Sequence, residues 1–279
     1  MNLFLADVRA FFAAARKELR QQRRYPTLFL GQLFWPVMLP ASWVLMGHAY
    51  SGNDPAALAA FAERAGSSNV AVFVFVGYAM YNWLSVLLWG PGTALRQEQL
   101  RGTLEAVFVT PASRLVPLFG PGMSALLPMA VVTATNLVAL RVFFGVAPPL
   151  SALVQAAVVV VLGIPALYAI GALFAASVLR FGEVAPVVQL VRGMFVLACG
   201  ITFPDAMLPV WAQVWAKLMP PTYIVDDIRR VLLGGEGVTD VAGDISIVLA
   251  LAALAAILSV AVFRYLEASA RRTGMLGQF

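Results

Sequence analysis

The sequence has little of the residue types on which most enzyme and metal sites depend. It contains one cysteine, Cys199, and one histidine, His48. A single cysteine excludes an internal disulfide framework and a cysteine-based zinc site, and a single histidine cannot form a histidine cluster. No GxSxG, HExxH or CxxC motif occurs, and a serine nucleophile would have only His48 as a histidine base. Metal, redox and covalent chemistry are therefore not expected of this chain.

Lysine is equally scarce, since Lys17 and Lys217 are the only two. A phosphate-binding loop that holds ATP needs a lysine after a glycine-rich turn, and neither lysine stands in that context. We therefore do not expect the chain to bind ATP by that route. Paired short, interrupted hydrophobic segments in two halves, which point to an inverted-repeat carrier, do not recur either.

Charged residues make up only 12% of the 279 residues, whereas soluble domains carry roughly a quarter. Uncharged runs cover residues 25–53, 65–95, 115–140, 142–179 and 245–263. Each run can supply the ~20 apolar residues of a transmembrane helix. A further apolar stretch is interrupted only by Arg192. The sequence thus predicts an all-α membrane protein, a single transmembrane domain over residues 1–279 with six spans at 27–48, 70–92, 117–140, 152–179, 184–203 and 245–263.

The basic residues are distributed unevenly between the two sides of this map. Thirteen lysines and arginines fall on the side of the two termini and five on the other, with Arg192 as the nineteenth. Because cytoplasmic loops are enriched in Lys and Arg, both termini are predicted to be cytoplasmic. The sequence pI of about 9.7 is explained by this topology-setting charge rather than by nucleic-acid binding.

The first 24 residues predict an amphipathic helix that lies on the inner membrane surface. Apolar residues recur at helical spacing on one face, namely Phe4, Val8, Phe11, Phe12, Ala15 and Leu19. The basic positions expected to attract anionic lipid are Arg16, Arg20, Arg23 and Arg24. A cleaved signal peptide would need a short apolar region and a small-residue cleavage site instead.

The predicted cytoplasmic loop, residues 93–116, contains a short helical segment. Thr103 to Val109 places Leu104, Val107 and Phe108 on one face and is bounded by Gly102 and Thr110-Pro111. Such a helix can fit the groove of a partner protein. From the residues alone, a loop helix resting on the membrane is an equal alternative.

The predicted outer segment, residues 204–244, contains two pieces too short to cross a membrane. Met207 to Leu218 is the first, and Pro220-Pro221 separates it from a second piece from Tyr223 to Leu233. Their aromatic residues suit the headgroup level. A surface helical hairpin explains the pattern, as does a pair of helices that re-enter the membrane.

These two segments together resemble the type-2 permease family of ATP-binding-cassette exporters. The first carries the Glu, Gly-Thr-Leu-Glu and Thr-Pro of that family at Glu98, 102–105 and 110–111. The second carries Phe203-Pro204, Leu208-Pro209 with Trp211, Pro220 to Tyr223 and the basic pair Arg229-Arg230. With the six spans and the amphipathic start, the resemblance extends over nearly the whole chain.

The resemblance implies specific roles for both segments. The first would be a coupling helix that contacts an ATPase through Glu98, Gly102, Thr103, Leu104 and Glu105. The second would form two outer re-entrant helices, marked by Pro204, Pro209, Trp211, Pro220 and Tyr223.

The implied function is that of the permease subunit of an exporter in a bacterial or archaeal plasma membrane. It would move an amphiphile outward, such as a drug, a lipid or a lipid-linked glycan. Its partners would be two copies of an ATPase subunit, which hold ATP and Mg, a second permease subunit, identical or paralogous, and membrane lipid. The chain itself would hold no cofactor and bind no nucleic acid. A membrane enzyme or assembly protein that modifies a lipid, and an ATP-independent carrier, remain as alternatives.

Arg192 is the one charge that the map places inside hydrocarbon. An arginine at a helix centre costs about 2.5–3.5 kcal/mol on insertion scales, so it is expected to face a cavity or a partner. Gln189 lies on the same face, whereas Glu183 lies roughly opposite. Gln189 and Arg192 are predicted to line a translocation pathway. The alternatives are an arginine that reaches toward the inner headgroups and an error in the span boundary.

Overall fold

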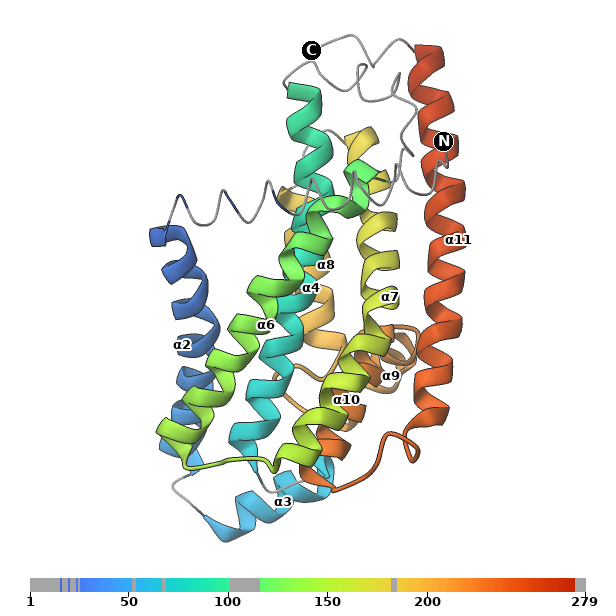
Figure 1. Ribbon diagram of the computed structural model, residues 1–279. Coiled ribbons are helices and arrows are strands. Elements are labelled where there is room, and N and C mark those ends of the chain that lie inside the picture. The colour runs from blue at the N-terminus through green and yellow to red at the C-terminus, as the bar shows by residue number, and fades with distance from the viewer. Residues whose placement is uncertain are drawn as a thin grey trace.

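The computed structural model describes residues 16, 20, 24, 26–51, 54–66, 69–100, 116–181 and 185–273. All regular secondary structure in these ranges is helical (Figure 1). The all-α prediction is therefore confirmed for the described part of the chain.

Six of the helices overlap the six predicted spans. They are α2 (Pro26–Ser51), α4 (Val70–Leu100), α6 (Val116–Phe144), α7 (Leu150–Phe181), α8 (Ala185–Ala198) and α11 (Ala242–Thr273). Three of them contain segments that are long and apolar enough to cross a membrane, namely Val70–Gly90, Leu150–Phe174 and Ala242–Val262. Shorter apolar helical stretches occupy Pro128–Phe144 and Val188–Ala198. A count of six full spans stays a prediction.

Several helices end elsewhere than the hydrophobic runs do. α4 continues to Leu100 and α11 to Thr273, well past the predicted ends at 92 and 263. The reason is that Arg, Gln and Glu are good helix formers, so a helix can extend beyond its apolar residues. In contrast, α8 ends at Ala198 rather than at 203, because Gly200 adopts a left-handed conformation (φ 62°) that turns the chain.

Helix α4 forms the centre of the bundle and packs against α2, α6, α7, α8 and α10, while α11 packs along α7 (Figure 1). Its inward side chains Leu84, Leu87 and Leu88 are fully buried. The indole Nε1 of Trp83 donates a hydrogen bond to the hydroxyl of Thr133 at 3.0 Å and so joins α4 to α6. These contacts make α4 the element against which the other helices are positioned.

The lower half of the bundle in Figure 1 contains the short helices, with α3 at the bottom. They are α3 (Pro55–Ala65), the 3₁₀ turn η1 (Asp205–Met207), α9 (Val210–Lys217) and α10 (Pro220–Leu233). The two short pieces predicted in the outer segment correspond to α9 and α10. Helix α3 was not predicted, although Asp54 caps its N-terminus by accepting a hydrogen bond from the Ala56 amide at 3.0 Å.

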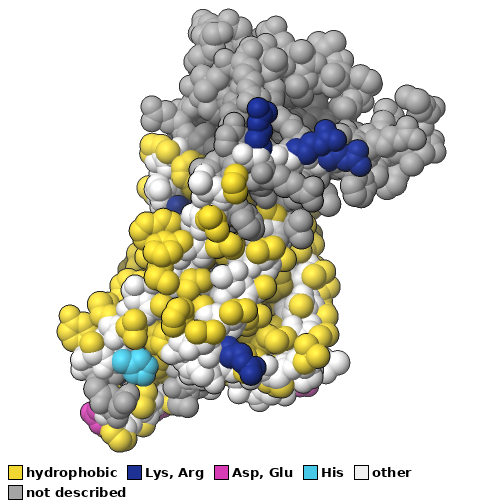
Figure 2. Space-filling model, turned by 60° about the vertical axis from the view of Figure 1, so that its left-hand side comes forward, with side chains coloured by type: hydrophobic (Ala, Val, Ile, Leu, Met, Phe, Trp, Pro, Cys, Tyr) yellow, Lys and Arg dark blue, Asp and Glu magenta, His cyan; other side chains and the backbone are white. Residues whose placement is uncertain are grey.

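The exterior of the bundle is largely apolar. Figure 2 shows hydrophobic side chains over the middle of one face, with Lys and Arg toward its ends. Large hydrophobic residues such as Trp35, Leu45 and Ile257 are exposed. An apolar belt of this kind indicates a protein embedded in a membrane.

Candidate functional site

The short-helix region contains a buried cation, Arg229 on α10. Only 6% of its surface is exposed. Its Nη2 donates to the carbonyl oxygen of Phe73 on α4 at 2.9 Å and, at 3.4 Å, to that of Ile201 in the bend after α8. The guanidinium carbon also lies 3.4 Å from the centroid of the Phe73 ring. One side chain therefore joins three segments that are far apart in the sequence, and we call this contact the Arg229 junction.

Two glycines allow the backbones at the Arg229 junction to approach one another. A Cβ atom on Gly77 of α4 would collide with the carbonyl oxygen of Ile201. Gly200 supplies the left-handed turn that directs this carbonyl toward α4 and α10. The junction thus depends on backbone contact as well as on the arginine.

The buried charge of Arg229 has a counter-charge on its own helix. Nη1 lies 3.7 Å from a carboxylate oxygen of Asp226, which is about half exposed. Burial lowers the pKa of Arg229, and the Asp226 carboxylate opposes this shift. Because Asp226 keeps contact with solvent, it can balance the arginine without being fully desolvated itself.

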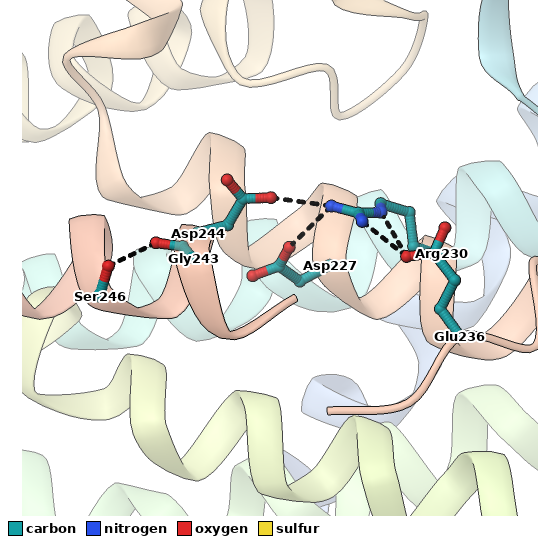
Figure 3. A network of polar contacts seen from close by, with 6 residues as sticks. All are labelled: Asp227, Arg230, Glu236, Gly243, Asp244 and Ser246. Atoms are coloured by element: carbon teal, nitrogen blue, oxygen red, sulfur yellow. Dashed lines mark hydrogen bonds and ion pairs between the residues drawn. The ribbon is translucent and has the colours of Figure 1, made fainter. Parts of the chain in front are cut away.

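The neighbouring Arg230 forms a separate network (Figure 3). Its Nε donates to Glu236 at 2.8 Å and its Nη1 to Asp244 at 2.8 Å. The Asp227 carboxylate lies 3.8 Å from the same Nη1. Arg230 therefore fastens α10 to the loop that follows it and to the first turn of α11.

Asp227 is the least satisfied member of the Arg230 network. It is 1% exposed, and neither of its carboxylate oxygens accepts a hydrogen bond from a donor in the described ranges. Burial raises its pKa to about 7, helped by the Asp244 charge and opposed by Arg230. Asp227 therefore changes its protonation near neutral pH.

Arg192 contacts α4 through an aromatic ring. Its guanidinium carbon lies 4.7 Å from the centroid of the Tyr81 ring, and its Nη1 donates to the Gln189 amide oxygen at 3.3 Å. The Nε atom is buried and has no hydrogen-bond partner among the described residues. Gln189 and Arg192 are thus brought together, as their spacing predicts. A lining role for this pair stays a prediction.

Sequence reasoning missed Tyr81 as the partner of Arg192. Asn82 on α4 and Asn136 on α6 are polar residues of other predicted spans, but neither forms a hydrogen bond with Arg192. Asn82 donates to the carbonyl of Tyr78 at 2.9 Å, and the buried Asn136 amide has no partner in the part of the chain described. A cation above a tyrosine on another helix leaves no periodic signal, so only the packing of α8 on α4 reveals it.

The predicted outer residues all lie in the short-helix region. Pro204 precedes η1, Pro209 precedes α9 and Pro220 opens α10. The Tyr223 hydroxyl donates to the last carbonyl of α9 at 2.9 Å, which ties α10 back to α9. Trp211 is 70% exposed on α9. These positions shape the ends of the short helices, and re-entry of the two helices into a membrane stays a prediction.

The predicted coupling residues lie mostly outside the described residues. Glu98 is within the last turns of α4, whereas Gly102, Thr103, Leu104 and Glu105 fall in the gap between 100 and 116. Of the basic residues at the start of the chain, Arg16, Arg20 and Arg24 are helical and exposed, and Arg23 lies outside the described residues.

A family model described as ABC-2 type transporter matches residues 9–233, well over half of the chain. This range includes the 93–116 segment, the Arg192 contact and the Arg229 junction. A search of curated proteins finds no match.

Proposed function

Because the chain belongs to the ABC-2 type transporter family, we propose that it is the membrane permease subunit of an exporter driven by a separate ATPase. The family match over residues 9–233 is the observation that carries this proposal. The apolar exterior and the long apolar helices agree with a membrane-embedded transport component.

The proposed contact with the ATPase is the segment between α4 and α6. The C-terminal end of α4 and the N-terminal end of α6 lie at the same end of the bundle, opposite the short helices (Figure 1). A segment held between these two ends can transmit movement of a soluble partner to both helices. We assign the contact to Glu98, Gly102, Thr103, Leu104 and Glu105, with two ATPase copies that bind ATP and Mg.

We further propose that α9 and α10 form the outer re-entrant pair. With 8 and 14 residues they are too short to cross a bilayer. Much of α10 is buried against α4, α7 and α11, whereas α9 exposes Trp211 and Trp215. Gln189 and Arg192 would line the pathway of an amphiphilic substrate at the contact with a second permease subunit.

The ATPase contact is tested by co-purification. An affinity-tagged chain, co-expressed with an ATP-binding-cassette ATPase encoded beside it, should retain that ATPase after extraction in mild detergent. Glu105→Lys reverses a charge at the proposed contact and should abolish retention and ATP hydrolysis by the complex. Its matched control is Glu63→Lys, which alters an exposed acid on α3 at the opposite end of the bundle.

The alternatives predict other outcomes of the same experiment. A lipid-modifying enzyme, an assembly protein or an ATP-independent carrier would be recovered without an ATPase, and that result would contradict the proposed function. If both charge reversals leave retention and hydrolysis unchanged, the ATPase contact lies elsewhere on the chain.

A further inference from the structure

Asp227 on α10 is a buried carboxyl group that receives no hydrogen bond within the described ranges. Its side chain is 1% exposed, and both of its oxygens lack a donor there. A buried carboxylate is normally stabilised by several donors or by a close counter-charge, because its desolvation is costly. The guanidinium of Arg230 lies 3.8 Å away, which is beyond hydrogen-bond distance. The ionised form of Asp227 is therefore poorly compensated in this structure.

The positive charge of Arg230 is shared among three carboxylates. Its Nε donates to Glu236 at 2.8 Å, and its Nη1 donates to Asp244 at 2.8 Å. Asp227 approaches the same Nη1 from α10 without a hydrogen bond. One guanidinium thus faces three acids, so negative charge is in excess when all three are ionised. A proton held by one of the acids would reduce this excess.

Asp244, in the first turn of α11, is the acid that faces Asp227. Figure 3 shows their two carboxyl groups side by side, both directed at the same nitrogen of Arg230. Burial is the main reason that the pKa of Asp227 is raised, and the charge of Asp244 and a hydrogen bond to Asp244 raise it further. Two carboxyl groups that interact this closely do not titrate independently, and the pair keeps one proton to a higher pH.

The other charged groups around α10 do not replace Asp244 in this pair. The charged residues on α10, on the loop after it and on the charged elements packed against it are Asp226, Asp227, Arg229, Arg230, Glu236, Asp240, Asp244 and Lys217. Asp226 forms an ion pair with Arg229, while Asp240 and Lys217 are exposed. Helices α4 and α7 also pack against α10, and they have no charged residue over 70–95 and 150–179.

We propose that Asp227 and Asp244 form a proton-binding site, in which one shared proton fastens α10 to the first turn of α11. In the protonated pair, Asp227 donates a hydrogen bond to the Asp244 carboxylate, which also accepts from Arg230. Loss of the proton leaves two carboxylates that repel each other, so the contact between α10 and α11 weakens. The proton passes to solvent at Asp244, whose side chain is 35% exposed. This inference goes beyond the proposed function and does not depend on an ATPase.

Infrared spectroscopy of the purified full chain in detergent tests the shared proton. Ordinary carboxyl groups are ionised above about pH 6, so a protonated-carboxyl band that disappears between about pH 6 and about pH 9 comes from a group with a raised pKa. Asp227→Asn should lose the band of one carboxyl group, whereas Glu63→Gln, which changes an exposed acid on α3, should lose none. Asp244→Asn should lower the midpoint of the Asp227 band by at least about one pH unit, because the interaction within the pair is removed.

Hydrogen–deuterium exchange in the first turn of α11 tests the consequence of proton loss. After correction for the intrinsic pH dependence of amide exchange, protection in the wild type should fall at least about tenfold between about pH 6 and about pH 9. Asp227→Asn can still donate to Asp244 and should keep its protection at both values.

Three results would contradict the proposal. The absence of a titrating band that Asp227→Asn removes, or a midpoint that Asp244→Asn leaves unchanged, would overturn the shared proton. Protection of α11 that does not change with pH in the wild type would overturn the fastening role. Each measurement uses the permease chain alone, so its failure is distinct from a failure of the co-purification experiment.

Discussion

Replacing Arg229 by methionine should weaken the attachment of α10 to the rest of the bundle. Methionine keeps an unbranched apolar stem of similar length but cannot donate to the carbonyls of Phe73 and Ile201. The Phe73 carbonyl still lies in a helix, whereas the Ile201 carbonyl loses the donor it faces at 3.4 Å. Asp226, which is about half exposed, can be hydrated once its partner is gone.

The size of the effect follows from three contributions. Each of the two hydrogen bonds from the charged guanidinium contributes roughly 1.5–3 kcal/mol, together about 3–6 kcal/mol, and the desolvated cation–π contact adds about 2 kcal/mol. Against these, the variant no longer has to bury a charge, which costs several kcal/mol in the wild type. We expect a net loss of about 3 kcal/mol, which corresponds to a fall in the unfolding midpoint on the order of 6 °C for a chain of this size.

The measurement is the apparent thermal midpoint of the detergent-solubilised protein, read from the monodisperse peak after heating. Arg229→Lys keeps the charge but cannot reproduce the planar fork, so its midpoint should fall between those of the wild type and Arg229→Met. Arg141→Met removes an exposed arginine from the end of α6 and should change the midpoint by about 1 °C or less. If Arg229→Met behaves like Arg141→Met, the Arg229 junction does not hold the short helices in place.

Three further predictions concern other features. Gly77→Ala should lower the same thermal midpoint, because its methyl group would displace the bend after α8, whereas Gly31→Ala on α2 meets nothing within 4 Å and should not lower it. In the wild type, the pKa of Asp227 is raised by burial, so ionisation of this carboxyl disfavours the folded state. The contribution of Asp227 to the stability of the fold therefore falls as the pH rises from about 4 to about 7. Asp227→Asn should be more stable than the wild type at pH 8 and should lose that advantage at pH 5. In a cysteine-free background, a cysteine at Thr239 should react with an impermeant reagent added outside the cell and one at Ser113 should not; the reverse pattern would contradict the predicted topology.

The long helices could be predicted because each contains a run of apolar, uncharged residues that extends over many turns. Hydropathy reports where apolar side chains stand, and it does not report where a helix ends. For this reason α4 continues through Glu98 to Leu100, and α8 stops at Ala198 although the apolar stretch continues. Helix α3 was not predicted because it has only 11 residues and modest amphipathicity.

The roles of individual polar residues were harder to obtain from the sequence. Arg229 and Arg230 are adjacent, and the resemblance treats them as one basic pair. A helix separates neighbouring side chains by about 100°, so one enters the bundle and the other faces a loop. Arg229 donates to the carbonyl oxygen of Phe73, which is 156 positions away in the sequence. A local sequence pattern cannot predict a contact to a backbone carbonyl at that sequence separation.

The close approach of Gly77 and Ile201 also limits the route of a transported molecule. At this level the backbone of α4 meets the backbone of the bend after α8, and the Arg229 side chain covers the contact. Two backbones in van der Waals contact leave no space for a solute, so this contact closes the gap between α4 and the bend after α8. A molecule that crosses this level therefore cannot pass between α4 and the bend after α8.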